Sequence, residues 1–137
     1  MTRIDFHTNV ADRLGYACRL VRKVYGAGKP VLVLGDRPAL AAFDAALWTF
    51  SALDFIPHCM GDNPLAAHTP IVLAESTDAS PHHAILLNLR AAVPANFARF
   101  ERLLELVGDV PDELDAGRER YRFYRDRGYQ LNLFKQA

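Results

Sequence analysis

The sequence predicts a three-layer α/β/α fold with a mostly parallel sheet, organised as a single domain over residues 1–137. Strand-like apolar runs alternate with helical patterns, which is the order that parallel βαβ units require. Two of these runs, Val31–Leu34 and Ile71–Ala74, are continuously apolar, as in strands that are buried on both faces. No linker or low-complexity segment divides the chain, and a chain of this length can form one core.

The first half of the chain is expected to alternate strands and helices. Apolar residues recur at steps of three and four between Asp12 and Gly26, which predicts an amphipathic helix. Asp36 is a suitable N-cap for a second helix. Pro57 confines the third strand to an edge of the sheet, because proline cannot donate a ladder hydrogen bond. The expected elements are strand Arg3–His7, helix 12–26, strand Val31–Leu34, a helix lined by Leu40, Phe43, Leu47 and Trp48, and strand Phe55–His58.

The second half is expected to contain two more strands and two helices. The polar segment between the two strands is too short for a helical crossover, so they either pair antiparallel or are joined by an irregular link. The expected elements are strands Ile71–Ala74 and Ala84–Leu89, a helix with the stripe Phe97, Phe100, Leu104 and Val107, a helix over Asp112–Arg127, and a tail over Tyr129–Ala137. The whole order is that of a Rossmann-like architecture, which does not by itself give a function.

Composition argues against several classes of protein. The 16 Lys and Arg residues balance the 16 Asp and Glu residues, so the basic surplus typical of nucleic-acid binders is absent. No apolar run approaches the roughly 20 residues of a membrane span. Cys18 and Cys59 form no CxxC pair, and the N-terminus lacks the apolar core of a signal peptide. We therefore expect a cytoplasmic protein with reduced thiols and with no membrane or direct nucleic-acid partner.

The segment Gly26–Pro30 superficially resembles a phosphate-binding P-loop. That motif would need glycine at position 23 and serine or threonine at position 30, where this chain has Lys23 and Pro30. The segment also follows a helix, whereas a P-loop follows a strand and leads into a helix N-terminus. A helix end is the better interpretation, and no nucleotide cofactor is expected.

Neither a metal site nor a catalytic centre is expected. His58 adjoins Cys59 and His82 adjoins His83, without the CxxC or HxxxH spacing that brings ligands together. No GxSxG nucleophile elbow occurs, and Cys18 lies on the apolar side of a helix, where a buried structural thiol is expected. The sequence thus predicts a protein without a cofactor, metal ligands or catalytic residues.

Trp48, Phe55 and Pro57 are candidates for a protein interaction surface. Trp48 lies about 100° round the helix from Leu47, at the edge of the apolar stripe. Tryptophan is a favoured anchor of protein interfaces. Burial of these side chains in the core is the alternative, and the sequence leaves both interpretations open.

The last expected helix begins with acidic residues and ends with arginines, which suits the helix macrodipole. It has more arginines than capping requires. Arg118, Arg122 and Arg125 stand at i, i+4 and i+7 on one face, and Tyr121 adjoins them. Because arginine binds carboxylates and phosphates bidentately, the pattern predicts a receptor for an acidic ligand with an apolar group. A solvated basic face is the alternative.

An ordered set of short segments gives the chain a family resemblance. The segments are Gly28–Val33, Asp44–Trp48, Phe55–His58, Pro70–Ile71, Arg118–Arg125 and Gly128–Asn132. Together they span nearly the full length, and with them the chain resembles the chi subunits of bacterial DNA polymerase III, which are components of the clamp-loader complex. The resemblance implies an α/β/α fold without catalytic activity and with two binding faces.

One implied face would bind the psi subunit, which ties chi to the core of the clamp loader. Trp48 and Phe55, with Pro57 beside them, match the aromatic residues of that face. The resemblance therefore implies a monomer that works within a hetero-complex.

The other implied face would bind the acidic C-terminal tail of single-stranded DNA-binding protein, which ends in Pro-Phe with a free carboxylate. Arg118, Tyr121 and Arg122 match that face, and Arg125 continues it.

Two other functions remain open at the level of the residues. A small nucleotide-handling α/β enzyme would bind or turn over a nucleotide. A direct nucleic-acid binder acting through the arginine helix would bind bare DNA with a steep salt dependence. An adaptor, by contrast, would bind DNA poorly unless single-stranded DNA-binding protein coats it.

Overall fold

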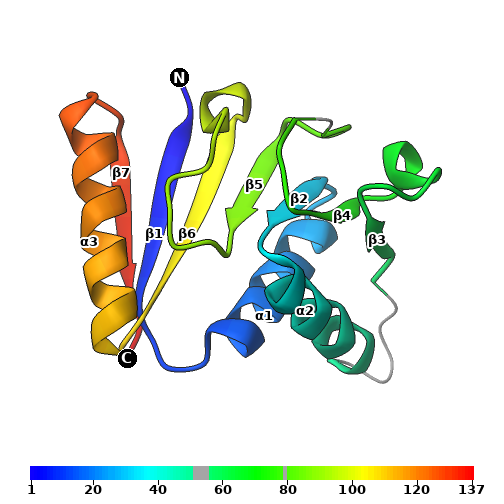
Figure 1. The fold of residues 1–137 in the computed structure, drawn as a ribbon, viewed down its shortest axis with the longest axis horizontal. Helices are drawn as coiled ribbons and strands as arrows, with labels where there is room; N and C mark the ends of the chain where they lie inside the picture. Colours follow the sequence, from blue (N-terminus) through cyan, green and yellow to red (C-terminus); the bar gives the residue numbers. More distant parts are fainter. Residues whose placement is uncertain (51–55, 79) are drawn as a thin grey trace.

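The computed structural model describes residues 1–50, 56–78 and 80–137, and its strands form one seven-stranded sheet (Figure 1). The strands are β1 (Arg3–Val10), β2 (Val31–Leu34), β3 (His58–Met60), β4 (Ile71–Ala74), β5 (Ile85–Asn88), β6 (Arg102–Gly108) and β7 (Leu131–Lys135). They lie in the order β3-β4-β2-β5-β6-β1-β7, and every pairing is parallel. The predicted α/β class with a parallel sheet is confirmed.

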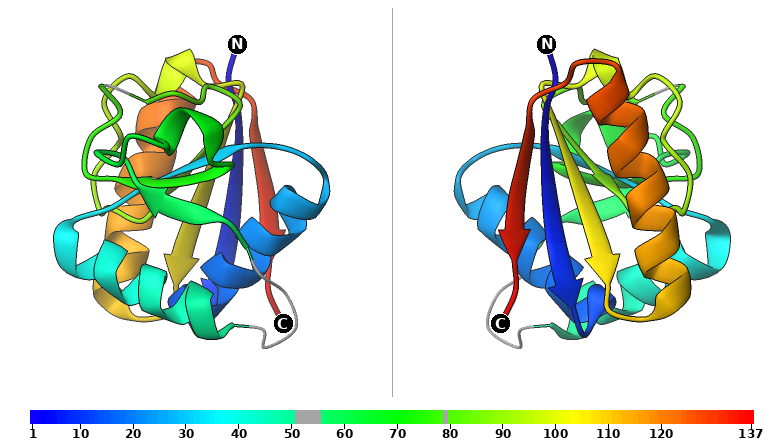
Figure 2. Two further views of the ribbon diagram at one scale, coloured as in Figure 1. Left: turned by 90° about the vertical axis from the view of Figure 1, so that its right-hand side faces the viewer. Right: turned by 90° about the vertical axis from the view of Figure 1, so that its left-hand side faces the viewer.

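Helices cover both faces of the sheet, which gives the three predicted layers (Figure 2). The helices are α1 (Arg13–Gly26), α2 (Arg37–Thr49) and α3 (Pro111–Asp126), with short 3-10 turns at Ala66–His68 and Phe97–Arg99. Asp12 and Asp36 cap α1 and α2, since each carboxylate accepts a hydrogen bond from a backbone N–H, at 3.1 Å from Gly15 and 2.9 Å from Ala39.

The core consists of two apolar clusters, one on each face of the sheet. Val31 and Val33 of β2 face α1 and α2, whereas Leu32 and Leu34 belong to the cluster beneath α3. All four side chains are buried, as expected of a central parallel strand with both faces covered.

The predicted helix over residues 97–107 is wrong. Phe97–Arg99 forms a single 3-10 turn, and Arg102–Gly108 is strand β6. In β6 Leu103 and Val107 point to the cluster under α3, while Leu104 and Leu106 point to the cluster under α1. A strand buried on both faces is apolar throughout, so its residues also satisfy a helical spacing.

The predicted tail is also wrong, because Leu131–Lys135 forms the edge strand β7 parallel to β1. Asn132 Nδ2 donates a hydrogen bond to Asp5 Oδ1 at 2.9 Å and ties the new strand to β1. The suggested antiparallel pairing of residues 71–74 with 84–89 is wrong as well. Strands β4 and β5 flank β2 on opposite sides, and the link between them is irregular.

Smaller boundary shifts affect several other elements. Strand β1 continues to Val10 instead of ending at His7, and β5 covers Ile85–Asn88 instead of Ala84–Leu89. The third strand is His58–Met60 instead of Phe55–His58, although its edge position is as predicted. Phe55 lies outside the described residues. The last helix begins at Pro111 and ends at Asp126, one residue earlier than expected at each end.

Gly117 allows α3 to approach β6, so Gly117→Ala should destabilise the fold. A Cβ there would lie 2.8 Å from both methyl groups of Val107. Overpacking of this kind costs about 1–3 kcal/mol, which outweighs the roughly 1 kcal/mol that alanine adds as a helix former. Urea unfolding measures the change. Gly26→Ala is the matched control, since a Cβ at Gly26 meets no atom within 4 Å, and a larger loss in the control would contradict this account.

Candidate functional site

The outer face of α3 presents the predicted arginines to solvent. The side chains of Arg118, Arg122 and Arg125 are 68%, 56% and 58% exposed. Arg118 lies 3.7 Å from Asp115 and Arg122 lies 3.7 Å from Glu119, one helical turn back in each case. Exposed pairs of this length contribute little to stability, so an incoming carboxylate can replace the acidic neighbours at small cost.

Tyr121 borders this arginine face and leads to an apolar ledge at the edge of the sheet. Its half-buried ring meets Phe6 of β1 edge-on, with 5.4 Å between the ring centres. Phe6 is paired in register with Leu133 of β7, so both side chains lie on the face that α3 covers. Leu133 is 60% exposed and Leu131 is half-buried in the same cluster. Cationic and apolar groups thus adjoin along one side of α3.

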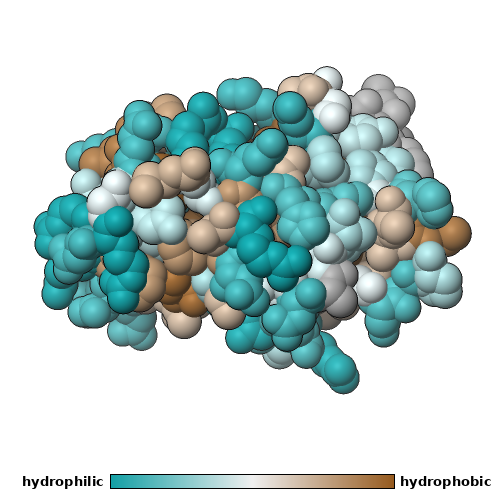
Figure 3. All heavy atoms as spheres, turned by 90° about the horizontal axis from the view of Figure 1, so that it is seen from above, coloured by the Kyte–Doolittle hydropathy of each residue, from teal (hydrophilic) through white to brown (hydrophobic). Residues whose placement is uncertain are grey.

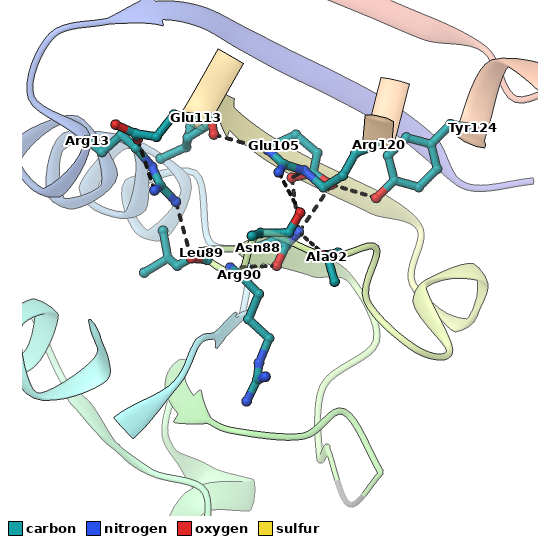
Figure 4. A network of polar contacts seen from close by, with 11 residues as sticks. Arg13, Asn88, Leu89, Arg90, Ala92, Glu105, Glu113, Arg120 and Tyr124 are labelled. Carbon is teal, nitrogen blue, oxygen red and sulfur yellow. Dashed lines mark hydrogen bonds and ion pairs between the residues drawn. The ribbon is translucent and has the colours of Figure 1, made fainter. Parts of the chain in front are cut away.

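Arg120, in the same helix, turns inward and anchors α3 to the sheet (Figure 4). Its Nε lies 3.0 Å from Glu105 Oε1, and its Nη1 donates to the carbonyl oxygen of Ala91 at 2.8 Å. Only 4% of Arg120 is exposed. The sequence pattern does not separate this structural arginine from the exposed ones.

Glu105 is the centre of the buried network (Figure 4). Its carboxylate accepts hydrogen bonds from the Tyr124 hydroxyl at 2.5 Å and from Asn88 Nδ2 at 3.1 Å. Burial raises the pKa of the Glu105 carboxyl, while the Arg120 charge and these hydrogen bonds oppose that rise. A single glutamate inside the apolar run of β6 is the sequence signal that could have revealed this network, since a buried acid requires partners.

Trp48 is exposed at the other candidate surface. It is 53% exposed, and its ring centre lies 4.5 Å from that of His58 in β3. His58 is held in turn by Asp44 of α2, with 2.9 Å between Nε2 and Oδ1. Burial of Trp48 in the core is therefore excluded. Pro57 is half-buried next to His58, and Phe55 lies outside the described residues. We call Trp48, Pro57 and His58 the aromatic surface.

The arginine face and the aromatic surface lie at opposite ends of the molecule. In Figure 1 α3 stands at the left beside β7, whereas α2 and β3 lie at the right. The face seen from above is mostly hydrophilic, with small separate apolar areas (Figure 3). The arginine face and the aromatic surface are therefore separate surfaces of the molecule.

The other predicted features have ordinary structural positions. Gly26 ends α1 and Gly28 has φ +79°, which places the lysine-containing segment in a turn between α1 and β2. Burial raises the pKa of Cys18 to about 11. Among the described residues, no three His, Cys, Asp or Glu side chains are grouped as metal ligands, and no described helix is long and apolar enough to cross a membrane.

Comparison with known proteins connects this geometry with a family. Residues 1–132 match the family described as DNA polymerase III chi subunit, HolC. The chain is 35% identical to DNA polymerase III subunit chi of Pseudomonas aeruginosa over 136 residues, which cover 96% of this chain and 94% of that protein. It is 27% identical to DNA polymerase III subunit chi of Escherichia coli, over 84% of this chain and 80% of that protein. Subunit chi of Haemophilus influenzae is 26% identical over 85% of this chain and 82% of that protein.

The family match spans the whole sheet up to Asn132 in β7, including the helix with the arginine face and the strand that adjoins Trp48. The relative from Pseudomonas aeruginosa extends the similarity over almost the full chain. On this evidence, the chain belongs to the family of DNA polymerase III chi subunits.

Proposed function

We propose that this protein is a non-catalytic adaptor of the replisome that works in the cytoplasm. It links the clamp-loader complex, through the psi subunit, to the acidic C-terminal tail of single-stranded DNA-binding protein. Its place in the chi family supports membership of a polymerase complex. The separation of the arginine face from the aromatic surface supports two partners that bind independently.

The arginine face beside the apolar ledge is the observation that carries the proposal. Arg118 and Arg122 are one turn apart, so their guanidinium groups can converge on the terminal carboxylate of a peptide or span two acidic side chains. The ledge of Tyr121, Leu131 and Leu133 offers an apolar wall for a terminal phenylalanine ring. A ligand that is both acidic and aromatic at its C-terminus uses both parts.

The exposure of the arginines sets the strength of this interaction. Side chains that are 56–68% exposed form ion pairs that salt screens. We therefore expect micromolar affinity, about 7–8 kcal/mol, that weakens as the salt concentration rises.

Arg118→Ala should reduce affinity for the tail peptide by about 1.5–3 kcal/mol, the range for hydrogen bonds to charged groups. Calorimetric titration of the peptide against both proteins measures this change. Lys29→Ala removes an exposed cation from the turn between α1 and β2, away from α3 and β7, and is the control. Equal affinity of wild type and Arg118→Ala, or equal binding of a peptide without its last phenylalanine, would refute the assignment of this face.

A further inference from the structure

Helix α1 presents a second concentration of positive charge, on the opposite face of the sheet from α3. Its 14 residues include several basic side chains and no acidic one. Arg19, Arg22 and Lys23 are exposed and stand at i, i+3 and i+4, so they share one face. We call these three residues the α1 basic patch. Arg19 and Lys23 form no ion pair with any carboxylate that the structure describes.

The α1 basic patch borders a shallow hollow of about 410 Å³, which is lined by its three side chains together with Gly26 and Phe50. The guanidinium carbon of Arg22 lies 5.9 Å from the centre of the Phe50 ring. A ligand in this hollow would therefore meet positive charge on one side and an aromatic wall on the other.

The hollow adjoins the aromatic surface across the end of α2. Phe50 is the C-terminal cap of α2 and follows Trp48 by two residues. The two rings leave the helix end on different sides, because Trp48 contacts His58 of β3 and Phe50 contacts Arg22 of α1. A partner large enough to cover the end of α2 would contact both the aromatic surface and the α1 basic patch.

The charges favour an acidic protein segment over a nucleic acid as the occupant. The chain has a net charge of zero, so it lacks the overall basic surplus that is typical of nucleic-acid-binding proteins. Three cations within one turn neutralise few phosphates, whereas DNA-binding proteins commonly contact 6–10 of them. An aromatic wall in a shallow hollow instead suits one side chain of a folded partner.

We propose that the partner bound at the aromatic surface also carries an acidic segment, which lies along Arg19, Arg22 and Lys23. This inference rests on the proposed function, since the psi subunit is the partner proposed for that surface. Charges at the rim of an interface act mainly on the rate of association, whereas a central aromatic anchor acts mainly on dissociation. The two parts of the interface should therefore have different kinetic effects.

The test measures binding of the psi subunit from the same organism by surface plasmon resonance at 50 and 300 mM salt. The double variant Arg19→Glu/Lys23→Glu should slow association about tenfold at 50 mM, with a much smaller effect at 300 mM and little change in dissociation. Arg99→Glu/Lys135→Glu is the matched control, because it reverses two exposed cations elsewhere and alters the net charge equally. Thermal melts verify that both variants are folded, and Arg19→Ala/Lys23→Ala replaces the first if it is not.

Each outcome decides a separate point. Equal association rates for the double variant and its control would overturn the acidic segment while leaving the adaptor function intact. Failure of the wild-type protein to bind psi would remove the proposed partner and this inference with it, whereas binding of the tail peptide to α3 would be unaffected. Binding of a dT20 oligonucleotide that Arg19→Glu/Lys23→Glu abolishes would assign the patch to nucleic acid and refute the proposal.

Discussion

Arg120→Ala should lower the free energy of unfolding by about 3–5 kcal/mol, the cost of leaving one member of a buried ion pair without its partner. The variant leaves the completely buried Glu105 carboxylate without its cationic partner. It also removes the hydrogen-bond donor of the Ala91 carbonyl oxygen. Denaturant unfolding followed by circular dichroism measures the loss.

Arg118→Ala is the matched control in the same helix, because Arg118 is exposed and its nearest carboxylate is 3.7 Å away. Its stability should stay within about 0.5 kcal/mol of wild type. Glu105→Gln with Arg120→Ala should restore part of the loss, since the uncompensated charge is then removed. A stability of Arg120→Ala close to that of Arg118→Ala would show that the buried network does not hold α3 in place.

Trp48→Ala should weaken binding of the psi subunit by about 2–4 kcal/mol, the usual cost of removing an anchoring tryptophan. This loss corresponds to about 30- to 700-fold in the dissociation constant. Because Trp48 is 53% exposed, the same change should cost less than about 1 kcal/mol in folding stability. Calorimetric titration with psi and a thermal melt together separate the two effects.

Leu65→Ala is the comparison for this experiment, since Leu65 is an equally apolar side chain that is 64% exposed outside the aromatic surface. It should bind psi as wild type does. If Trp48→Ala lowers the melting temperature but leaves the affinity for psi unchanged, Trp48 is not part of the interface.

The central strands and the helix starts were predictable because their signals are local. Val31–Leu34 is apolar at every position, as in a strand with both faces covered, and the run is too short for a helix. Asp36 could be identified as a cap because an N-cap needs only its own side chain and the next few backbone groups. The shared helix face of Arg118, Arg122 and Arg125 likewise follows from helical spacing alone.

The errors concern features that depend on residues far away in the chain. Strand β6 becomes a strand because β5 and β1 pair with both its edges, and β7 needs β1 as its partner. The inward turn of Arg120 depends on Glu105 in β6, fifteen residues earlier. A pattern within one helix cannot distinguish this arginine from its neighbours, and the exposure of Trp48 depends in the same way on where β3 lies.

The position of β1 also determines when the protein can fold during its synthesis. The first strand pairs with β6 and β7, and contacts such as Thr2 Oγ1 to the Phe100 carbonyl join residues 98 positions apart. At about 5–20 residues per second, a ribosome needs several seconds or more after making β1 before its partners exist. Until β6 has been made, β1 lacks both of its neighbours in the sheet. A truncated chain that ends before β7 would lack Leu131 and Leu133, so the ledge beside the arginines can form only after β7 has been made.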